Sequence, residues 1–252
     1  MIIIRNEQRE ALRHIVNQSF IEELSAFLAQ EFSEDSKILG HEQVRIVVKL
    51  GIQQSQAYGF NTTEDIKKYV KLMFLLGSYF DEDPIFPWAK KILQNPSFTS
   101  PSFRMHNLYV TANRFLKKTA GDKGQHYRAA LIRAYHMRYE EYICNSGLDL
   151  ISHIQTILSS LYPQQYRHIS HSSFQALIQL AKNIACEFNV SSRGGTSIIA
   201  VLMFMLGCHF YRDPLHPWVK SILQSDLKLE NKPQEIQKVA KAQLEQYRIA
   251  QG

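Results

Sequence analysis

Apolar residues recur along this chain at the spacing of helices, and no stretch alternates between polar and apolar residues long enough to suggest a strand. Val44, Val47, Val48 and Gly51, for example, follow the i, i+3, i+4, i+7 spacing that places side chains on one helical stripe. The pattern therefore predicts an all-α protein. We expect helices over residues 7–31, 41–58, 62–76, 84–94, 101–118, 126–161, 170–188, 196–206, 214–224 and 233–249.

The pattern also repeats. Residues 72–94 read LMFLLGSYFDEDPIFPWAKKILQ and residues 202–224 read LMFMLGCHFYRDPLHPWVKSILQ, so 14 of 23 positions are identical at an offset of 130 residues. The apolar stripes upstream match at the same offset. Self-similarity at a fixed offset indicates repeated structural units. The sequence therefore predicts two tandem copies of a roughly five-helix unit, related by approximate two-fold symmetry, in residues 1–122 and 123–252.

The repeated segment contains residues that bend and anchor a helical chain. Gly77 follows an apolar helix, where a left-handed C-cap needs glycine. Asp83 before Pro84 is typical of a helix start, with Pro87 in the first helical turn. Trp88 is then expected in the core. The second copy repeats each position as Gly207, Asp213, Pro214, Pro217 and Trp218.

An alternative reading makes Asp83 and Asp213 a catalytic or metal-binding carboxylate pair. We favour the structural reading, because aspartate before proline is ordinary helix-start chemistry. The sequence has no phosphate-binding glycine loop, no G-x-S-x-G, no H-E-x-x-H and no C-x-x-C among its three cysteines. We therefore expect no catalytic residues, no metal site and no cofactor.

The two copies differ most at the repeated turn. An acidic loop in the first copy becomes basic and aromatic in the second, because Asp81 is replaced by Tyr211 and Glu82 by Arg212. Neutral drift on a solvated surface would explain the change, and so would a partner-binding surface, because Tyr and Arg are enriched at interface hot spots. The candidate partner-binding residues are Tyr79, Asp81, Glu82, His209, Tyr211, Arg212 and His216. A third reading is an enzyme or small-ligand carrier that uses His209, Tyr211 and His216.

Charge and hydropathy narrow the classes of function. The net charge is +6 and is spread along the chain, whereas a dedicated nucleic-acid binder usually concentrates its basic residues on one face. The longest apolar run, residues 198–206, is far shorter than the ~20 residues that cross a bilayer. The N-terminal apolar run is too brief for a secretory signal. We expect a cytoplasmic protein that does not bind membranes, and we favour nucleic-acid binding less than protein binding.

One family shares the motif of the first copy. The residues that carry the match are Tyr58-Gly59-Phe60, Glu64-Asp65-Ile66, Leu72-Met73-Phe74, Gly77, Phe80-Asp81, Asp83-Pro84, Pro87-Trp88 and Ile92-Leu93. This pattern resembles a family of small helical proteins often encoded beside effector genes of bacterial type VI secretion systems. Members usually carry one copy, so this chain looks like a duplication. The second copy departs from the pattern, with Tyr211 in place of Asp81 and Phe188-Asn189 in place of Tyr58-Gly59.

The resemblance implies a protein-binding function. It points to a non-enzymatic factor for a secreted effector, either an adaptor or chaperone for type VI secretion or a cytoplasmic immunity protein. The implied partner is the effector toxin itself or a component of the secretion spike. No catalytic residues carry over from the family. The alternative from another class is a basic helical module that binds nucleic acid.

Overall fold

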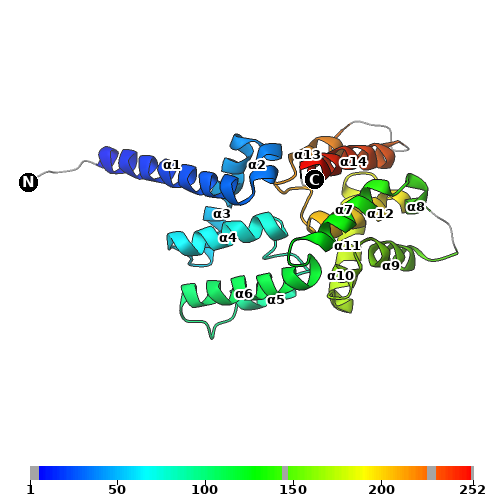
Figure 1. Ribbon diagram of the computed structural model, residues 1–252, viewed down its shortest axis with the longest axis horizontal. Helices are drawn as coiled ribbons and strands as arrows, with labels where there is room; N and C mark the ends of the chain where they lie inside the picture. The colour runs from blue at the N-terminus through cyan, green and yellow to red at the C-terminus, as the bar shows by residue number, and fades with distance from the viewer. Residues whose placement is uncertain (1–5, 144–146, 226–230, 251–252) are drawn as a thin grey trace, which may run out of the picture.

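The computed structural model describes residues 6–143, 147–225 and 231–250, and for 6–17 and 248–250 it describes the backbone alone. Across these ranges it contains fourteen helices and no strand, which confirms the all-α prediction. Figure 1 shows α3 to α6 on one side of the molecule and α7 to α12 on the other. The first turns of α1 extend away from this body (Figure 1). No helix in the described ranges is long and apolar enough to cross a membrane.

Three helices of the first half have counterparts in the second half at a constant offset in sequence. The first half contains α1 (Asn6–Glu31), α2 (Ser33–Leu39), α3 (His41–Ala57), α4 (Thr63–Leu76), α5 (Pro87–Leu93) and α6 (Pro101–Thr119). The second contains α7 (Gln125–His136), α8 (Tyr139–Ile143), α9 (Leu150–Leu161), α10 (Pro163–Tyr166), α11 (His171–Glu187), α12 (Arg193–Leu206), α13 (Pro217–Leu223) and α14 (Lys232–Ala250). The bounds of α3 and α11, of α4 and α12, and of α5 and α13 differ by 130 residues at both ends.

Side-chain caps fix the starts of α4 and α12. The Thr62 hydroxyl accepts a hydrogen bond from the backbone N–H of Asp65 at 3.2 Å. The Ser192 hydroxyl does the same for Gly195 at 3.1 Å. Such a cap satisfies one of the free N–H groups of the first helical turn. The helix expected from Thr196 therefore begins three residues earlier, at Arg193, because Ser192 caps it.

The prediction of one continuous helix over residues 126–161 is wrong. The chain leaves the helical conformation at Met137, where φ is −58° and ψ is 131°, and α8 follows as a short separate helix. Gly147 has a positive φ of 77°, and Asp149 then caps α9 through the N–H groups of Ile151 and Ser152. Residues 144–146 lie outside the described ranges.

Neither α5 nor α13 begins at the aspartate-proline pair, as the sequence had suggested. Both start three residues later, at Pro87 and Pro217, and their N-cap residues Phe86 and His216 make no side-chain cap. The carboxylate of Asp83 is instead held by other N–H groups, which are described below. Two short helices, α2 and α10, were not predicted.

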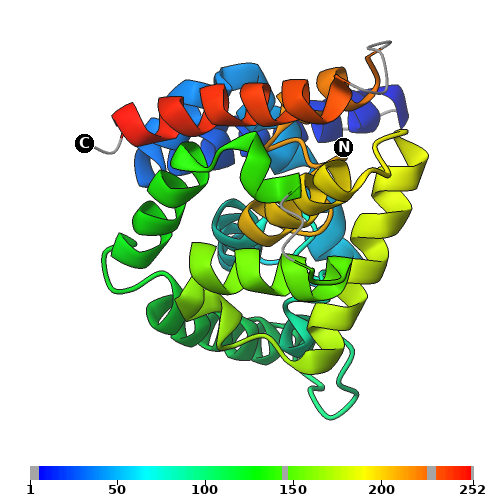
Figure 2. The same ribbon diagram turned by 90° about the vertical axis from the view of Figure 1, so that its right-hand side faces the viewer.

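One hydrophobic core joins the two halves of the chain. It includes fully buried Tyr69 and Met105 from the first half and Phe204 and Phe210 from the second. Burying each such side chain stabilises the fold by roughly 1.5–3 kcal/mol. The C-terminal α14 packs on α2, α7 and α12, and Figure 2 shows it running across the top of the molecule in front of the N-terminal helices. The proposed units 1–122 and 123–252 therefore share a core.

A smaller cluster holds α1 to the body, and the tryptophans lie at the edge of the main core. Leu24 and Leu28 of α1 pack with Val48 of α3 in this second cluster. Trp88 and Trp218 are half-buried and pack against the main core from outside. They are thus more peripheral than the expected core anchors.

Candidate functional site

The two copies of the repeated turn lie face to face at the centre of the molecule. We call residues 77–86 the first turn and residues 207–216 the second turn. In each, the aspartate accepts a hydrogen bond from the backbone N–H two residues later: Ile85 to Asp83 Oδ1 and Leu215 to Asp213 Oδ1, both 2.8 Å. One carboxylate oxygen therefore fixes the shape of the aspartate's own turn.

The second oxygen of each aspartate binds the opposite turn. Asp83 Oδ2 accepts from the backbone N–H of Cys208 at 2.7 Å, and Asp213 Oδ2 accepts from that of Ser78 at 2.7 Å. Both aspartates are buried, with 4% and 5% of their surface exposed. A buried carboxylate without partners would be strongly unfavourable. The pair of crossed bonds therefore ties the halves together where water does not compete.

The glycines allow the two turns to approach. Gly77 and Gly207 each have φ 97° and ψ 149°, a conformation that side chains disfavour. A Cβ on Gly77 would lie 3.2 Å from the carbonyl oxygen of Leu206 and 3.9 Å from Cα of Gly207. A Cβ on Gly207 would lie 3.5 Å from the carbonyl oxygen of Leu76. The positions read from sequence as helix C-caps are thus also the points of closest backbone contact between the halves.

The buried environment shifts the ionisation of this centre. Burial raises the pKa of Asp83 to about 6, although the N–H groups of Cys208 and Ile85 oppose the shift. Burial raises the pKa of the Cys208 thiol, and the negative charge of Asp83 raises it further. A thiol held protonated in this way is a weak nucleophile.

The carboxylate pair has the geometry of a structural link. All four oxygens of Asp83 and Asp213 accept backbone N–H bonds. Within the described ranges, no three His, Cys, Asp or Glu side chains are grouped as metal ligands would be. The reading of these residues as a catalytic or metal-binding pair therefore has no support from their contacts.

Five of the seven candidate partner-binding residues come together on the surface above the crossed turns. We call Tyr79, Glu82, His209, Tyr211 and Arg212 the turn patch. The Arg212 guanidinium lies over the Tyr79 ring, 4.2 Å from its centroid, and donates to Glu82 Oε2 at 2.8 Å. The ring centroids of Tyr79 and His209 are 5.9 Å apart, and those of His209 and Tyr211 are 6.4 Å apart.

The turn patch is accessible and mainly uncharged apart from one ion pair. The side chains of Arg212 and Glu82 are 42% and 59% exposed, while the three rings are half-buried. Burial and the nearby Arg212 lower the pKa of His209, so its imidazole is neutral at pH 7. The patch therefore presents rigid aromatic edges around an exposed guanidinium, a composition typical of binding hot spots.

The other two candidates lie elsewhere. Asp81 is only 5% exposed and accepts a 2.7 Å hydrogen bond from the Tyr58 hydroxyl. In the second copy the corresponding side chains, Phe188 and Tyr211, make a ring contact of 6.0 Å instead. Exchange of Asp81 for Tyr211 thus accompanies exchange of Tyr58 for Phe188. His216 lines a pocket on another side of the turns.

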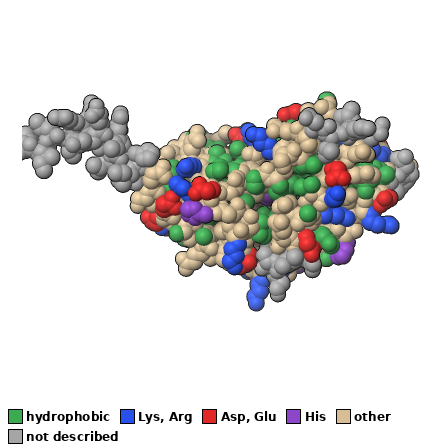
Figure 3. All heavy atoms as spheres, turned by 90° about the horizontal axis from the view of Figure 1, so that it is seen from above, with side chains coloured by type: hydrophobic (Ala, Val, Ile, Leu, Met, Phe, Trp, Pro, Cys, Tyr) green, Lys and Arg blue, Asp and Glu red, His purple; other side chains and the backbone are tan. Residues whose placement is uncertain are grey.

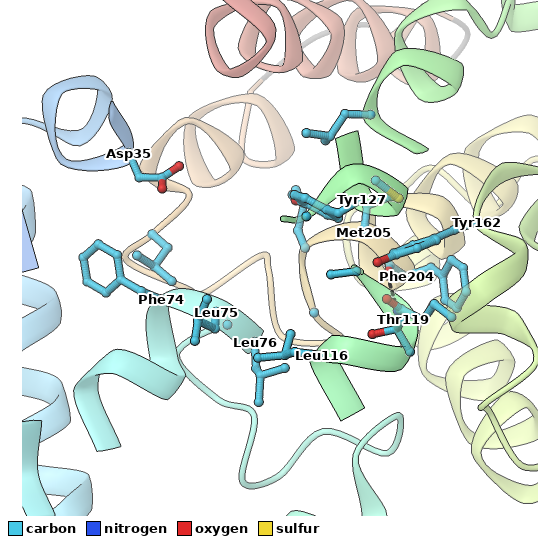
Figure 4. Close-up of a pocket in the computed structure, with 18 of the residues that line it drawn as sticks. Asp35, Phe74, Leu75, Leu76, Leu116, Thr119, Tyr127, Tyr162, Phe204 and Met205 are labelled. Carbon is cyan, nitrogen blue, oxygen red and sulfur yellow. Dashed lines mark hydrogen bonds between the residues drawn. The ribbon is translucent and has the colours of Figure 1, made fainter. Parts of the chain in front are cut away.

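That pocket was not predicted from the sequence. It has a volume of about 290 Å³ and lies between α2, α4, α6, α7, α12 and α14 (Figure 4). Its walls include Phe74, Leu116 and Phe204, and its few polar lining groups include Asp35, Tyr127 and Tyr247. These residues come from helices far apart in sequence. Within each helix they follow the ordinary spacing of an apolar face, so no local motif marks the pocket.

Charged side chains do not gather into a basic face on the side of the molecule shown in Figure 3. Lys and Arg side chains there are interspersed with Asp and Glu. Several basic residues are also paired, including Lys67 with Glu23 and Arg45 with Glu22. Nucleic-acid affinity depends on cations that neutralise successive phosphates, so this arrangement does not favour such a ligand.

Comparison of the chain with family models, with curated proteins and with solved structures found no match.

Proposed function

We propose that this protein is a non-enzymatic binding factor for a secreted bacterial effector, acting as a type VI secretion adaptor or chaperone or as a cytoplasmic immunity protein. The observation that carries the proposal is the turn patch. Tyr79, His209, Tyr211 and Arg212 are brought from positions 130 residues apart into one accessible cluster. The class of partner is the one implied by the resemblance of the first copy to proteins encoded beside type VI effectors.

The proposal includes a duplicated architecture. Two tandem copies of one helical unit would pack about an approximate two-fold axis that passes between Gly77 and Gly207. The reciprocal bonds of Asp83 and Asp213 and the constant offset of three helix pairs support this arrangement. The turn patch then lies where the two copies meet, and its asymmetry gives the surface one orientation towards a partner.

Charge reversal at Arg212 tests the role of the patch. The purified chain and its Arg212→Glu variant would be titrated with effector proteins encoded beside the gene, and the dissociation constants measured by calorimetry. We expect Arg212→Glu to weaken the complex at least about tenfold, because a central arginine commonly carries more than 1 kcal/mol of binding energy. Lys220→Glu on α13 is the matched control, since it makes the same charge change at an exposed site outside the patch.

A second variant separates binding from structure. The exchange Glu82→Arg with Arg212→Glu keeps an ion pair in place but moves the cation. Full recovery of binding in the exchange variant would show that Arg212 acts by holding the turns together. Two results together would overturn the proposal in favour of a nucleic-acid module. No effector encoded beside the gene would bind the protein, and the protein would bind DNA or RNA with an affinity that falls steeply with salt.

A further inference from the structure

The pocket beside the crossed turns has the walls of a small-molecule site. Phe74 and Leu116 of the first half face Phe204 and Met205 of the second across it, as Figure 4 shows. Its volume of about 290 Å³ is roughly twice the ~150 Å³ of an apolar cavity that holds benzene. Ligand sites of this kind are mostly apolar with a few polar groups that orient the ligand. The walls therefore fit a short alkyl chain or a pair of small rings.

The pocket opens to solvent. Phe204 at its inner wall is 1% exposed, whereas Leu75, which also lines it, is 37% exposed. Asp35 and Tyr127 are half-buried at the same pocket. A ligand could thus enter without unfolding of the core.

The described lining of the pocket contains one carboxylic acid and no strongly basic side chain. Among the described lining residues, Asp35 is the only carboxylic acid and there is no Lys or Arg, while burial lowers the pKa of His216. Among described residues, no side chain forms an ion pair or hydrogen bond with the Asp35 carboxylate. In Figure 4 the Asp35 side chain leaves α2 towards the side on which Tyr127 lies.

The electrostatics agree with this geometry. Burial raises the pKa of Asp35, because the carboxylate loses water without gaining a cation. Burial also raises the pKa of Tyr247 to about 12, and the Asp35 charge contributes to that shift. The same charge adds to the effect of burial on Tyr127. The phenol groups of Tyr127, Tyr162 and Tyr247 thus share the pocket with a carboxylate that has no cationic partner among the described residues.

We propose that this pocket binds a small apolar amine, whose hydrocarbon part lies against Phe74, Leu116 and Phe204 and whose protonated nitrogen donates a hydrogen bond to Asp35. The ammonium group supplies the positive charge that the lining lacks. An anionic head group would meet Asp35 with no compensating cation. The tyrosine hydroxyls can accept or donate the remaining hydrogen bonds of a polar head.

Competition among three ligands with the same chain tests the proposal. The neutral dye N-phenyl-1-naphthylamine would report occupation of the pocket, and decylamine, decanol and decanoate would displace it below their micelle concentrations. We expect decylamine to bind at least about tenfold more tightly than decanoate, as one charge-assisted hydrogen bond implies. Asp35→Asn should remove most of this preference. Glu34→Gln, on the same helix but outside the lining, should leave it unchanged.

A variant that fills the pocket checks the site independently of charge. Leu116→Trp projects a larger side chain into the space, and Val110→Trp places the same side chain at an exposed position of α6. We expect only Leu116→Trp to reduce dye binding. Equal affinities for the three ligands, or dye binding that survives Leu116→Trp, would overturn the proposal. So would a wild-type protein that binds neither dye nor decylamine.

Discussion

A glycine in each turn sets how closely the two halves approach. Gly77, Gly207 and Gly40 share nearly the same backbone, with φ of 97°, 97° and 79° and ψ of 149°, 149° and 154°. Their surroundings differ, because a Cβ on Gly40 would meet nothing within 4 Å. Gly40 therefore isolates the cost of the backbone conformation from the cost of close contact.

Substitution of alanine at these glycines should give unequal losses of stability. Gly40→Ala should lower the free energy of unfolding by roughly 1–3 kcal/mol through backbone strain alone. Gly77→Ala should lose at least about 1 kcal/mol more, because its Cβ would press on the Leu206 carbonyl in a packed centre. Urea unfolding of both variants measures the difference. Equal losses would show that the close approach of the turns contributes little.

The sequence predicted which residues matter in the turns but not what they contact. Asp83 and Asp213 were expected to start helices, and instead bind N–H groups 125 and 135 residues away. A pattern of neighbours along the chain cannot reveal such donors. The grouping of Tyr79 with Arg212 follows from the same crossing, whereas the burial of Asp81 depends on Tyr58, outside the turn.

The contact between helices α3 and α4 uses residues of different sizes from those at the contact between α11 and α12. A Cβ on Gly51 of α3 would lie 2.8 Å from Cγ2 of Val70 and 2.7 Å from Sδ of Met73 on α4. At the same offset in the second half, Ala181 of α11 stands where Gly51 stands, and Ala200 of α12 stands where Val70 stands. Both alanines are fully buried. A small residue on one helix thus makes room for a larger one on its neighbour.

This exchange predicts a favourable coupling between two substitutions. Gly51→Ala should destabilise by overpacking and Val70→Ala by leaving space, each by roughly 1–3 kcal/mol. Together they should lose about 1 kcal/mol less than the sum, because they reproduce the pairing of the second half. A double-mutant cycle from urea unfolding measures the coupling. The pair Gly51→Ala and Ile154→Ala, in different halves, should add; additivity in the first pair as well would contradict the argument.

Helix positions were predictable where the apolar spacing is regular, with or without a side-chain cap. The predicted ends of α3, α4 and α11 match to within one residue, and Thr62 caps α4. The break at Met137 was missed because apolar residues continue on both sides of it. No side chain there marks the extended ψ of 131° that ends α7.

Across the whole molecule, the shared core and the crossed turns couple the stability of the two halves. Core residues from both halves belong to one cluster, and α14 packs on α2. Separate domains would divide the core between them. We therefore expect the protein to unfold as one cooperative unit.

The two tryptophans allow each half to be observed separately. Trp218→Phe leaves Trp88 as a reporter of the first half, and Trp88→Phe leaves Trp218 for the second. Fluorescence-monitored urea curves of the two variants should each match the circular-dichroism curve of the same variant. Adding Asp213→Ala should shift both reporters together, because its carboxylate binds Ser78 of the first half. A shift confined to Trp218 would show that the halves unfold independently.

Each turn has two polar groups, an aspartate oxygen and a backbone N–H, whose hydrogen-bond partners lie on the other turn. A shorter chain with a single such turn would carry an aspartate oxygen and a backbone N–H that here bind the opposite turn rather than each other. Self-association of two such chains would satisfy both at once. Covalent linkage of the copies raises their effective concentration and makes that pairing independent of dilution. It also allows the two turns to carry different residues at matching positions, as Glu82 and Arg212 do.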